Sequence, residues 1–257
     1  MTDAVLGARM LTEQQQTFYR ENGYLLLPNL VRQPQIDAFN QHIWSLRAAP
    51  DPPPWVIARQ ENGAVDAAER FAKRLFNPHL HDEFALRMMK LPEVGHILSD
   101  LLGAAAVGVQ SMYFYKVPGT PGQANHQDYY YIKNELNTLT ACWIAMEDAD
   151  EENGCLWVIP GSHNGPLLKH GKVRDTDEHE HWTDEVEGAD VSGEIPVRMK
   201  AGEALFFHNL LIHSSTKNRS AARSRRSYVC HYIRHDSVIF RQDLHKKIYF
   251  DHDDGEL

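Results

Sequence analysis

The stretch VGVQSMYFYKV at residues 107–117 decides the fold class. It is short and rich in aromatic and β-branched side chains, which predicts a β-strand. Segments of the same texture, separated by Gly, Pro or Asn, follow at residues 138–147, 155–159, 195–199, 204–207 and 225–234. A series of short strands of this kind indicates a β-sandwich or a small barrel.

Helical patterns precede the strands. Residues 11–23 begin with Thr12 as an N-cap and end at Asn22-Gly23, and the strand YLLLPNL follows them directly. Apolar residues recur at helical spacing over residues 34–47, and a helical pair is expected over residues 81–102. Helices followed by many short strands favour an α+β fold. We expect a cupin-like jelly roll, or double-stranded β-helix, with flanking N-terminal helices.

The composition is that of a globular enzyme. A length of 257 residues, with 42% hydrophobic and 24% charged residues, fits a single domain over residues 1–257. The formal net charge of -9 argues against a nucleic-acid partner, because phosphate binding needs clustered Lys and Arg. The cysteines at 142, 155 and 230 are scattered without a C-x-x-C pair, so we expect reduced, buried thiols.

The opening residues, MTDAVLGARM, lack the basic region and long apolar run of a signal peptide. No stretch approaches the roughly 18 uninterrupted apolar residues of a membrane span. We therefore expect a cytoplasmic protein that has no membrane partner.

Residues 164–194 are polar and rich in Asp, Glu and His. They are long for a connection without secondary structure, which predicts a lid or a mobile loop. Within them, the acidic run DEHEHW at residues 177–182 would suit a cationic or amine-bearing substrate, and the alternative is a solvated acidic loop.

Two potential metal ligands lie two residues apart in NHQDYYYI, which begins at residue 125. On a strand, the side chains of His126 and Asp128 leave the same face and can bind one ion. The downstream segment GEALFFHNLLIHSS offers His208 and His213 as a third ligand, and periodicity does not choose between them. Two histidines and one carboxylate leave three metal positions open, which suits non-haem Fe(II) and oxygen. The chain holds 15 histidines, so a His-x-Asp triplet also arises by chance.

A cluster of arginines follows the second histidine segment. Arg223, Arg225 and Arg226 introduce the final strand, RRSYVCHYI. A guanidinium holds a carboxylate through two parallel hydrogen bonds, as the far end of a bidentate oxo-acid requires. The alternative is a solvated basic patch.

Together these segments resemble the phytanoyl-CoA dioxygenase family of Fe(II)/2-oxoglutarate oxygenases. The resemblance extends over nearly the whole chain, through ENGYLLLPNL, VQSMYFYKVP, NHQD, CWIAMEDADEENGCLWVIPGSH, GEALFFHNLLIHSS and SRRSYVCHY in this order. An ordered series is more specific than a single triplet. It implies Fe(II), 2-oxoglutarate and O2 as cofactor and cosubstrates, with release of succinate and carbon dioxide.

The resemblance also implies roles by position. His126, Asp128 and His213 match the iron ligands of the family, so His213 is preferred to His208. Arg225 matches the arginine that binds the far carboxylate of 2-oxoglutarate.

Three further residues, Trp143, Met112 and Lys73, match family positions near 2-oxoglutarate. Halogenases that resemble the family carry a small residue in place of the carboxylate ligand. The presence of Asp128 therefore implies hydroxylation, or a related desaturation or ring closure, rather than halogenation.

The substrate side is predicted from strand parity alone. Tyr130 would point the same way as His126 and Asp128 and line the substrate side, with Tyr129 and Tyr131 on the opposite face. We expect a small-molecule substrate, but no segment selects one, and the oligomeric state is not encoded in a readable pattern.

Two other functions compete with that of a dioxygenase. A cupin-like binding or sensory protein would keep the fold without turnover, and the intact ligands and arginine anchor argue against it. A zinc-type hydrolase would need a general base beside the metal.

Overall fold

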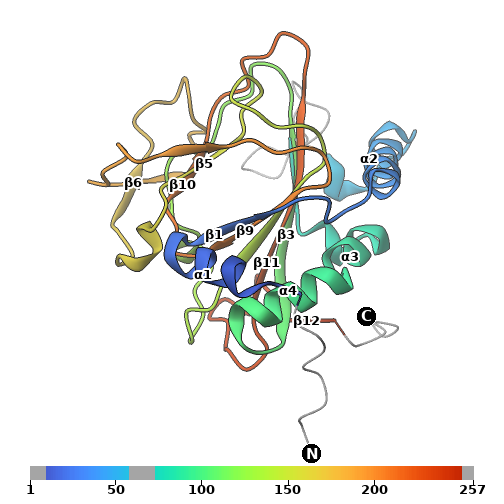
Figure 1. The fold of residues 1–257 in the computed structure, drawn as a ribbon. Helices are drawn as coiled ribbons and strands as arrows, with labels where there is room; N and C mark the ends of the chain where they lie inside the picture. The colour runs from blue at the N-terminus through green and yellow to red at the C-terminus, as the bar shows by residue number, and fades with distance from the viewer. Residues whose placement is uncertain (1–9, 58–72, 251–257) are drawn as a thin grey trace, which may run out of the picture.

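The computed structural model describes residues 10–57 and 73–250 (Figure 1). The opening residues 1–9, which bear on the expected absence of a signal peptide, lie outside the described part. Within that part, no helix is long and apolar enough to cross a membrane. The three cysteines are free and buried, which confirms the expectation of reduced thiols.

The α-helices of the described residues fall where capping residues and apolar periodicity predict them. They are α1 (Glu13–Asn22), α2 (Gln33–Ala48), α3 (Glu83–Met89) and α4 (Pro92–Leu102). Thr12 caps α1 by accepting a hydrogen bond from the backbone N–H of Gln15, and Gly23 ends it at a φ of 79°. The predicted helical pair is confirmed, because Pro92 opens α4 shortly after α3 ends.

The strands of the described residues form three antiparallel sheets. The largest has the order β1-β9-β4-β11-β3-β12, with β2 also paired to β3. Its strands are β1 (Tyr24–Leu27), β2 (Arg74–Phe76), β3 (Ala106–Lys116), β4 (Thr140–Ala145), β9 (Ala204–His208), β11 (Arg225–Arg234) and β12 (Ile248–Tyr249). The second, of order β10-β5-β8, contains β5 (Leu156–Val158), β8 (Ile195–Val197) and β10 (His213–Ser215). The third pairs β6 (His170–Lys172) with β7 (Asp184–Val186).

Alternation along the long strands divides the side chains of the large sheet between two faces. Tyr113 and Tyr228 point to one face, where they pack with Phe39 of α2. Trp143 points to the other face and belongs to a core cluster with Val158 of the second sheet. Figure 1 shows α2, α3 and α4 gathered on one side of the large sheet and β5 and β10 on the other. Two facing sheets with helices outside one of them are the predicted α+β jelly roll.

The segment around Asp128 is not the strand that the sequence predicts. His126 forms an isolated bridge with His213, and Asp128–Tyr130 forms a short 3₁₀-helix, η3. The backbone N–H of Tyr130 donates to the Gln127 carbonyl oxygen at 3.0 Å. Three consecutive tyrosines have the composition of a strand, but this tight turn sets the direction of their side chains instead.

Residues 164–194, the expected lid or mobile loop, carry structure of their own. The hairpin β6–β7 lies within them, and His179 forms a parallel bridge with Gly122. The N–H of Gly122 donates to the Glu178 carbonyl oxygen, and the N–H of Glu180 donates to that of Gly122, both at 2.8 Å. The segment is therefore hydrogen-bonded to the rest of the chain, and its function as a lid stays a prediction.

Replacing Gly122 by alanine is expected to lower the free energy of unfolding by about 1–3 kcal/mol. A Cβ at this position would lie 1.8 Å from the carbonyl oxygen of Ser215, a backbone atom that cannot turn aside. Chemical denaturation measures the change. Gly193→Ala, where a Cβ meets nothing within 4 Å, is the matched control, and equal stability of the two variants would contradict the close approach.

Candidate metal centre

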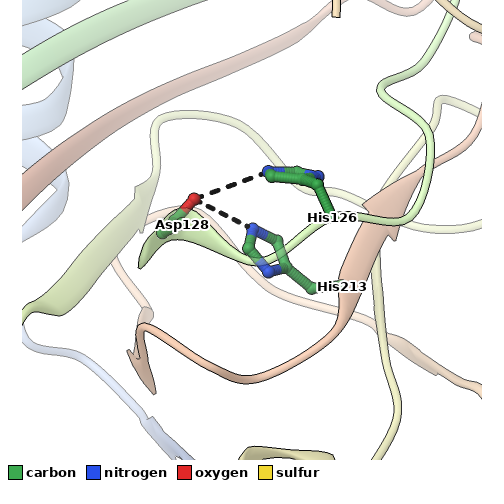
Figure 2. Close-up of side chains that lie close together, drawn as sticks. All are labelled: His126, Asp128 and His213. Atoms are coloured by element: carbon green, nitrogen blue, oxygen red, sulfur yellow. Dashed lines mark ion pairs between the residues drawn. The ribbon is translucent and has the colours of Figure 1, made fainter. Parts of the chain in front are cut away.

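Three side chains from distant parts of the sequence meet at one point (Figure 2). His126 and His213 lie side by side because each backbone N–H donates to the carbonyl oxygen of the other residue, at 3.0 and 3.1 Å. Their ring centroids are 4.1 Å apart. Asp128 opens η3 two residues after His126, and its carboxylate faces both rings.

The ligand atoms of these residues, which we call the triad, are placed to share one ion. Nε2 of His126 and Nε2 of His213 lie 3.5 and 3.7 Å from the same oxygen, Oδ1 of Asp128. All three ligand atoms lie within 4.8 Å of one another. The Nδ1–H groups donate to the carbonyl oxygens of Ala124 and Leu211 at 2.8 and 3.0 Å, which leaves each Nε2 as an acceptor for a metal. The residues present therefore fit a metal ion.

The charges of the triad also suit a divalent cation. Burial, and then the neighbouring ring of His126, lower the pKa of His213 to about 4, so its ring is neutral near neutral pH. Burial acts to raise the pKa of Asp128, but the nearby histidine rings and their hydrogen bonds hold that pKa well below its usual range. Neutral imidazoles and one carboxylate are the ligand set of non-haem iron, with three positions left for other ligands.

His208, the alternative third ligand, lies outside this group. It ends β9, its Nδ1 accepts a hydrogen bond from the backbone N–H of Leu210 at 3.2 Å, and its ring packs against His163. Over residues 10–57 and 73–250, the triad is the one group of three His, Cys, Asp or Glu whose ligand atoms lie this close together. The structure thus brings His213 into the triad and leaves His208 out.

His231, which the sequence did not single out, contacts the carboxylate of Asp128 in the triad. Its Nε2–H donates to Oδ2 of Asp128 at 3.1 Å, while Oδ1 faces the two histidine ligands. The side chain is buried, and its Nδ1 has no hydrogen-bond partner among the described residues. His231 and Arg225 are an even number of residues apart on β11 and share one face. Alternation along this predicted strand is the signal that could have identified His231.

We expect His231→Phe to weaken metal binding about 10- to 100-fold, the usual cost of losing an outer partner of a ligand. The phenyl ring fills the space but cannot donate a hydrogen bond to Asp128. Calorimetric titration with Co(II), which stands in for Fe(II), measures the Kd, and the visible spectrum of bound Co(II) reports the ligand geometry. His231→Gln retains an N–H donor and should recover part of the affinity. Unchanged Co(II) binding by His231→Phe would show that the contact is not needed.

The triad lines a cavity of about 600 Å³. Met112, Trp143 and Lys73, which the family resemblance implies near 2-oxoglutarate, line the same cavity. Its apolar walls are formed by Phe114, Leu156, Phe207 and Val229. The structure therefore brings the expected metal and cosubstrate residues together, and the individual cosubstrate roles stay predictions.

Tyr130 is placed differently from the expectation. It is absent from the described residues that line the cavity. Its ring stacks on His170 with centroids 4.1 Å apart, and its hydroxyl donates to Asp184 at 3.3 Å. The parity argument for Tyr130 is wrong, because residues 128–130 turn in η3 instead of extending as a strand. Tyr131 packs edge-on against His126 with centroids 5.9 Å apart.

Two of the three clustered arginines are engaged by carboxylates. Arg223 donates to Asp150 at 2.7 and 2.8 Å and to Glu152 at 2.6 Å. Arg226 forms an ion pair with Glu147 at 2.5 Å. Neither lines the cavity in the described part of the chain, so neither is placed to hold a ligand beside the triad.

Arg225 is placed differently from its neighbours. It lines the cavity and is only 3% exposed, and burial lowers the pKa of its guanidinium to about 10. Nε donates to the Gly154 carbonyl oxygen at 3.2 Å and Nη1 donates to Oγ of Ser227 at 2.7 Å. The guanidinium also lies 5.4 Å from the ring centroid of Trp143. Among the described residues, no ion pair joins it to a carboxylate.

Lys116 adds a second buried cation that sequence reasoning missed. It is the partner of Arg225 in the register of β3 and β11, so both side chains lie on the cavity face. Nζ donates to the Thr216 carbonyl oxygen at 2.6 Å and to Oγ of Ser215 at 3.3 Å. Burial, and then the charge of Arg225, lower the pKa of Lys116 well below its usual value. Among the described residues, neither side chain forms an ion pair with a carboxylate, so this face of the cavity favours a bound anion.

The jelly roll, the triad and the cationic pair define an iron- and 2-oxoglutarate-dependent oxygenase. The chain matches the family described as phytanoyl-CoA dioxygenase (PhyH) over residues 19–227. It belongs to this family, which confirms the resemblance found in the sequence.

Individual proteins support the same assignment. Phytanoyl-CoA dioxygenase 1 of rice, Oryza sativa subsp. japonica, is 30% identical over 257 residues, which cover 88% of this chain and 90% of the rice protein. The peroxisomal phytanoyl-CoA dioxygenase of Rattus norvegicus is 29% identical over 237 residues, covering 88% of this chain and 70% of the rat protein. The epimerase SnoN, solved with Fe3+, α-ketoglutarate and nogalamycin RO, has a TM-score of 0.69 at 19% identity and covers 88% and 84% of the two chains. The fold, the enzyme class and the use of iron and 2-oxoglutarate are thus as predicted.

Proposed function

We propose that the protein hydroxylates a small-molecule metabolite, with 2-oxoglutarate and O2 as cosubstrates and succinate and carbon dioxide as products. The observation that carries this proposal is one cavity that contains both the triad and the buried pair Arg225 and Lys116. A dicarboxylate that chelates a metal with one end and meets a cation with the other fits this arrangement.

In this proposal the protein binds and orients the cosubstrate. Arg225 donates to the far carboxylate of 2-oxoglutarate, and Lys116 adds positive charge on the same face of the sheet. Trp143 and Met112 pack against its carbon chain, and Lys73 contributes an ammonium group to the same cavity.

Iron held by the triad would, together with 2-oxoglutarate, supply the oxidising chemistry that acts on a C–H bond of the substrate. The residues of the chain position the substrate and exclude water from the cavity. The apolar walls formed by Phe114, Leu156, Phe207 and Val229 exclude water and hold the substrate carbon toward the metal. A general base is not required for this chemistry.

Hydroxylation is favoured over halogenation because Asp128 is present and faces both histidine ligands. A carboxylate at this position occupies the place that a halide would need. Desaturation and ring closure use the same ligand set and remain alternative outcomes of the same site.

A small metabolite fits a cavity of about 600 Å³. The relatives are named for phytanoyl-CoA, and the structural neighbour was solved with nogalamycin RO, both small molecules. For this chain we propose only that the substrate is a small molecule. A single domain over residues 1–257, the lid function of residues 164–194 and a cytoplasmic location stay predictions.

Oxygen consumption and succinate release in the presence of Fe(II) and 2-oxoglutarate test the proposal. We expect both without added substrate at a low rate, and faster with an active member of a metabolite library. A cupin-like binding protein would release no succinate under any substrate. A zinc-type hydrolase would keep its activity under argon, whereas the proposed enzyme loses it.

A further inference from the structure

A further cavity-lining cation, Arg74 of β2, lies where the cavity reaches solvent. Arg74, Glu180, His181 and Trp182 line the cavity and are half-buried or exposed, whereas the triad is buried. We call these four residues the cavity mouth. The guanidinium of Arg74 lies over the indole of Trp182, 3.8 Å from the ring centroid.

This stacking leaves the hydrogen-bonding edge of Arg74 available. A guanidinium that stacks on an aromatic ring uses its face, and its N–H donors lie in the plane at its edge. Within residues 10–57 and 73–250, no hydrogen bond or ion pair of the guanidinium is formed, and burial lowers the pKa of Arg74. The charge of Glu180 acts in the opposite direction and favours the charged form, and the N–H donors of Arg74 can bind a ligand that reaches the cavity mouth.

Other arginines near acidic residues are paired in this protein. Ion pairs join Arg174 to Glu185, Arg198 to Glu151, Arg219 to Glu178, Arg223 to Asp150 and Arg226 to Glu147. In contrast, the two cavity-lining arginines, Arg74 and Arg225, have no carboxylate partner among the described residues. In the proposed function, 2-oxoglutarate binds the metal with one carboxylate and Arg225 with the other. An anion at Arg74 would therefore belong to another molecule.

The stack is held in place from both sides. Arg74 pairs in register with Phe114 of β3, so its side chain lies on the cavity face of the large sheet. Nε1–H of Trp182 donates to Oε2 of Glu180 at 3.0 Å, and the backbone of Glu180 is bonded to Gly122. The cation is thus preorganised at the mouth.

Two acidic residues of this segment, Glu178 and Glu180, already have partners within the chain. Glu178 forms an ion pair with Arg219 and accepts the backbone N–H of Lys217 at 2.9 Å. Glu180 accepts the indole N–H of Trp182. These two carboxylates of the run DEHEHW are therefore less available to bind an amine of a substrate.

We propose that Arg74, supported by Trp182, binds an anionic group of the substrate, a carboxylate or a phosphate, at the mouth of the cavity. This inference rests on the proposed function and narrows its substrate class to anions. The substrate carbon that reacts then lies between the anion at Arg74 and the triad.

Fluorine NMR with small probes tests the site. The protein is loaded with Mn(II), in place of Fe(II), and saturated with 2-oxoglutarate under argon. Trifluoroacetate, monofluorophosphate and the neutral trifluoroacetamide are then titrated in, and the bound metal speeds the ¹⁹F relaxation of a probe held in the cavity. We expect saturable enhancement for at least one of the two anions and none for the amide, and the responding anion tells a carboxylate site from a phosphate site.

Variants assign the signal to Arg74. Arg74→Gln should weaken binding of the responding anion about tenfold or more, because a charge-assisted hydrogen bond is lost. Arg74→Lys keeps the charge without the planar fork and should be intermediate. Arg174→Gln, which removes an arginine paired with Glu185 and absent from the cavity lining, is the matched control and should bind as wild type.

Three results would overturn the proposal: equal enhancement by the neutral amide, no enhancement by either anion, or unchanged anion binding in Arg74→Gln. Each of these leaves the proposed function standing if the Mn(II) complex with 2-oxoglutarate has formed. Failure to form that complex, seen as an unchanged Mn(II) electron paramagnetic resonance signal on adding 2-oxoglutarate, would overturn the proposed function and the anion site together.

Discussion

Replacing His213 by alanine is expected to abolish tight metal binding and, with it, the 2-oxoglutarate-dependent consumption of oxygen. The variant removes one of three ligands whose atoms lie within 4.8 Å of one another. The loss should exceed the about 10- to 100-fold that follows removal of an outer partner of a ligand, because a direct metal bond is broken. Calorimetric titration with Co(II) and the rate of succinate release measure the two effects.

His208→Asn is the matched control for this experiment. His208 lies in the same sequence segment, and its Nδ1 accepts a hydrogen bond from Leu210 that an asparagine oxygen can also accept. We expect this variant to bind Co(II) like the wild type. Loss of metal in His208→Asn together with retention in His213→Ala would reverse the assignment of the third ligand.

Arg225→Gln is expected to weaken binding of 2-oxoglutarate by roughly 10²- to 10⁴-fold. Two hydrogen bonds to a charged group contribute about 1.5–3 kcal/mol each, so their loss costs about 3–6 kcal/mol. The guanidinium is buried, and no described carboxylate pairs with it, so its replacement removes both charge-assisted hydrogen bonds to a bound carboxylate. The KM for 2-oxoglutarate, and the Kd measured under argon with Mn(II) present, give the change.

Arg226→Gln controls for the loss of an arginine beside the same strand end. Arg226 is paired with Glu147 and is absent from the described cavity lining, so its loss should leave the Kd for 2-oxoglutarate within a fewfold of wild type. Arg225→Lys retains the charge but not the bidentate fork, and we expect it to recover part of the affinity. Equal effects of Arg225→Gln and Arg226→Gln would contradict the assignment of Arg225 as the anchor.

The long strands and the helices could be predicted because their patterns are local. The eleven residues of β3 form a strand where VGVQSMYFYKV predicts one, and α1 is delimited by Thr12 and Gly23. The three-residue strands β5 and β8 lie within segments whose composition predicted them, but β10, which is equally short, was not predicted as a separate strand. β10 forms because its residues bond to β5 and because His213 bridges to His126. These are contacts that no local pattern contains.

Part of the candidate site could also be predicted from the sequence, and part could not. The two histidines and the aspartate belong to a narrow set of residue types that bind metals. The family resemblance then identified which positions in the chain match the iron ligands. The direction of Tyr130 could not be predicted, because a 3₁₀ turn at Asp128 replaces the strand that three tyrosines favour. Lys116 could not be found either. It faces Arg225 only through the register of β3 and β11, which joins residues more than a hundred positions apart.

A crystal structure of the protein with Fe(II) and 2-oxoglutarate, prepared under argon, tests the central claim most directly. We expect the metal on Nε2 of His126, Oδ1 of Asp128 and Nε2 of His213, with the far carboxylate of 2-oxoglutarate against the guanidinium of Arg225. A metal bound away from these three atoms, or a carboxylate held by Arg223 or Arg226 instead, would contradict it.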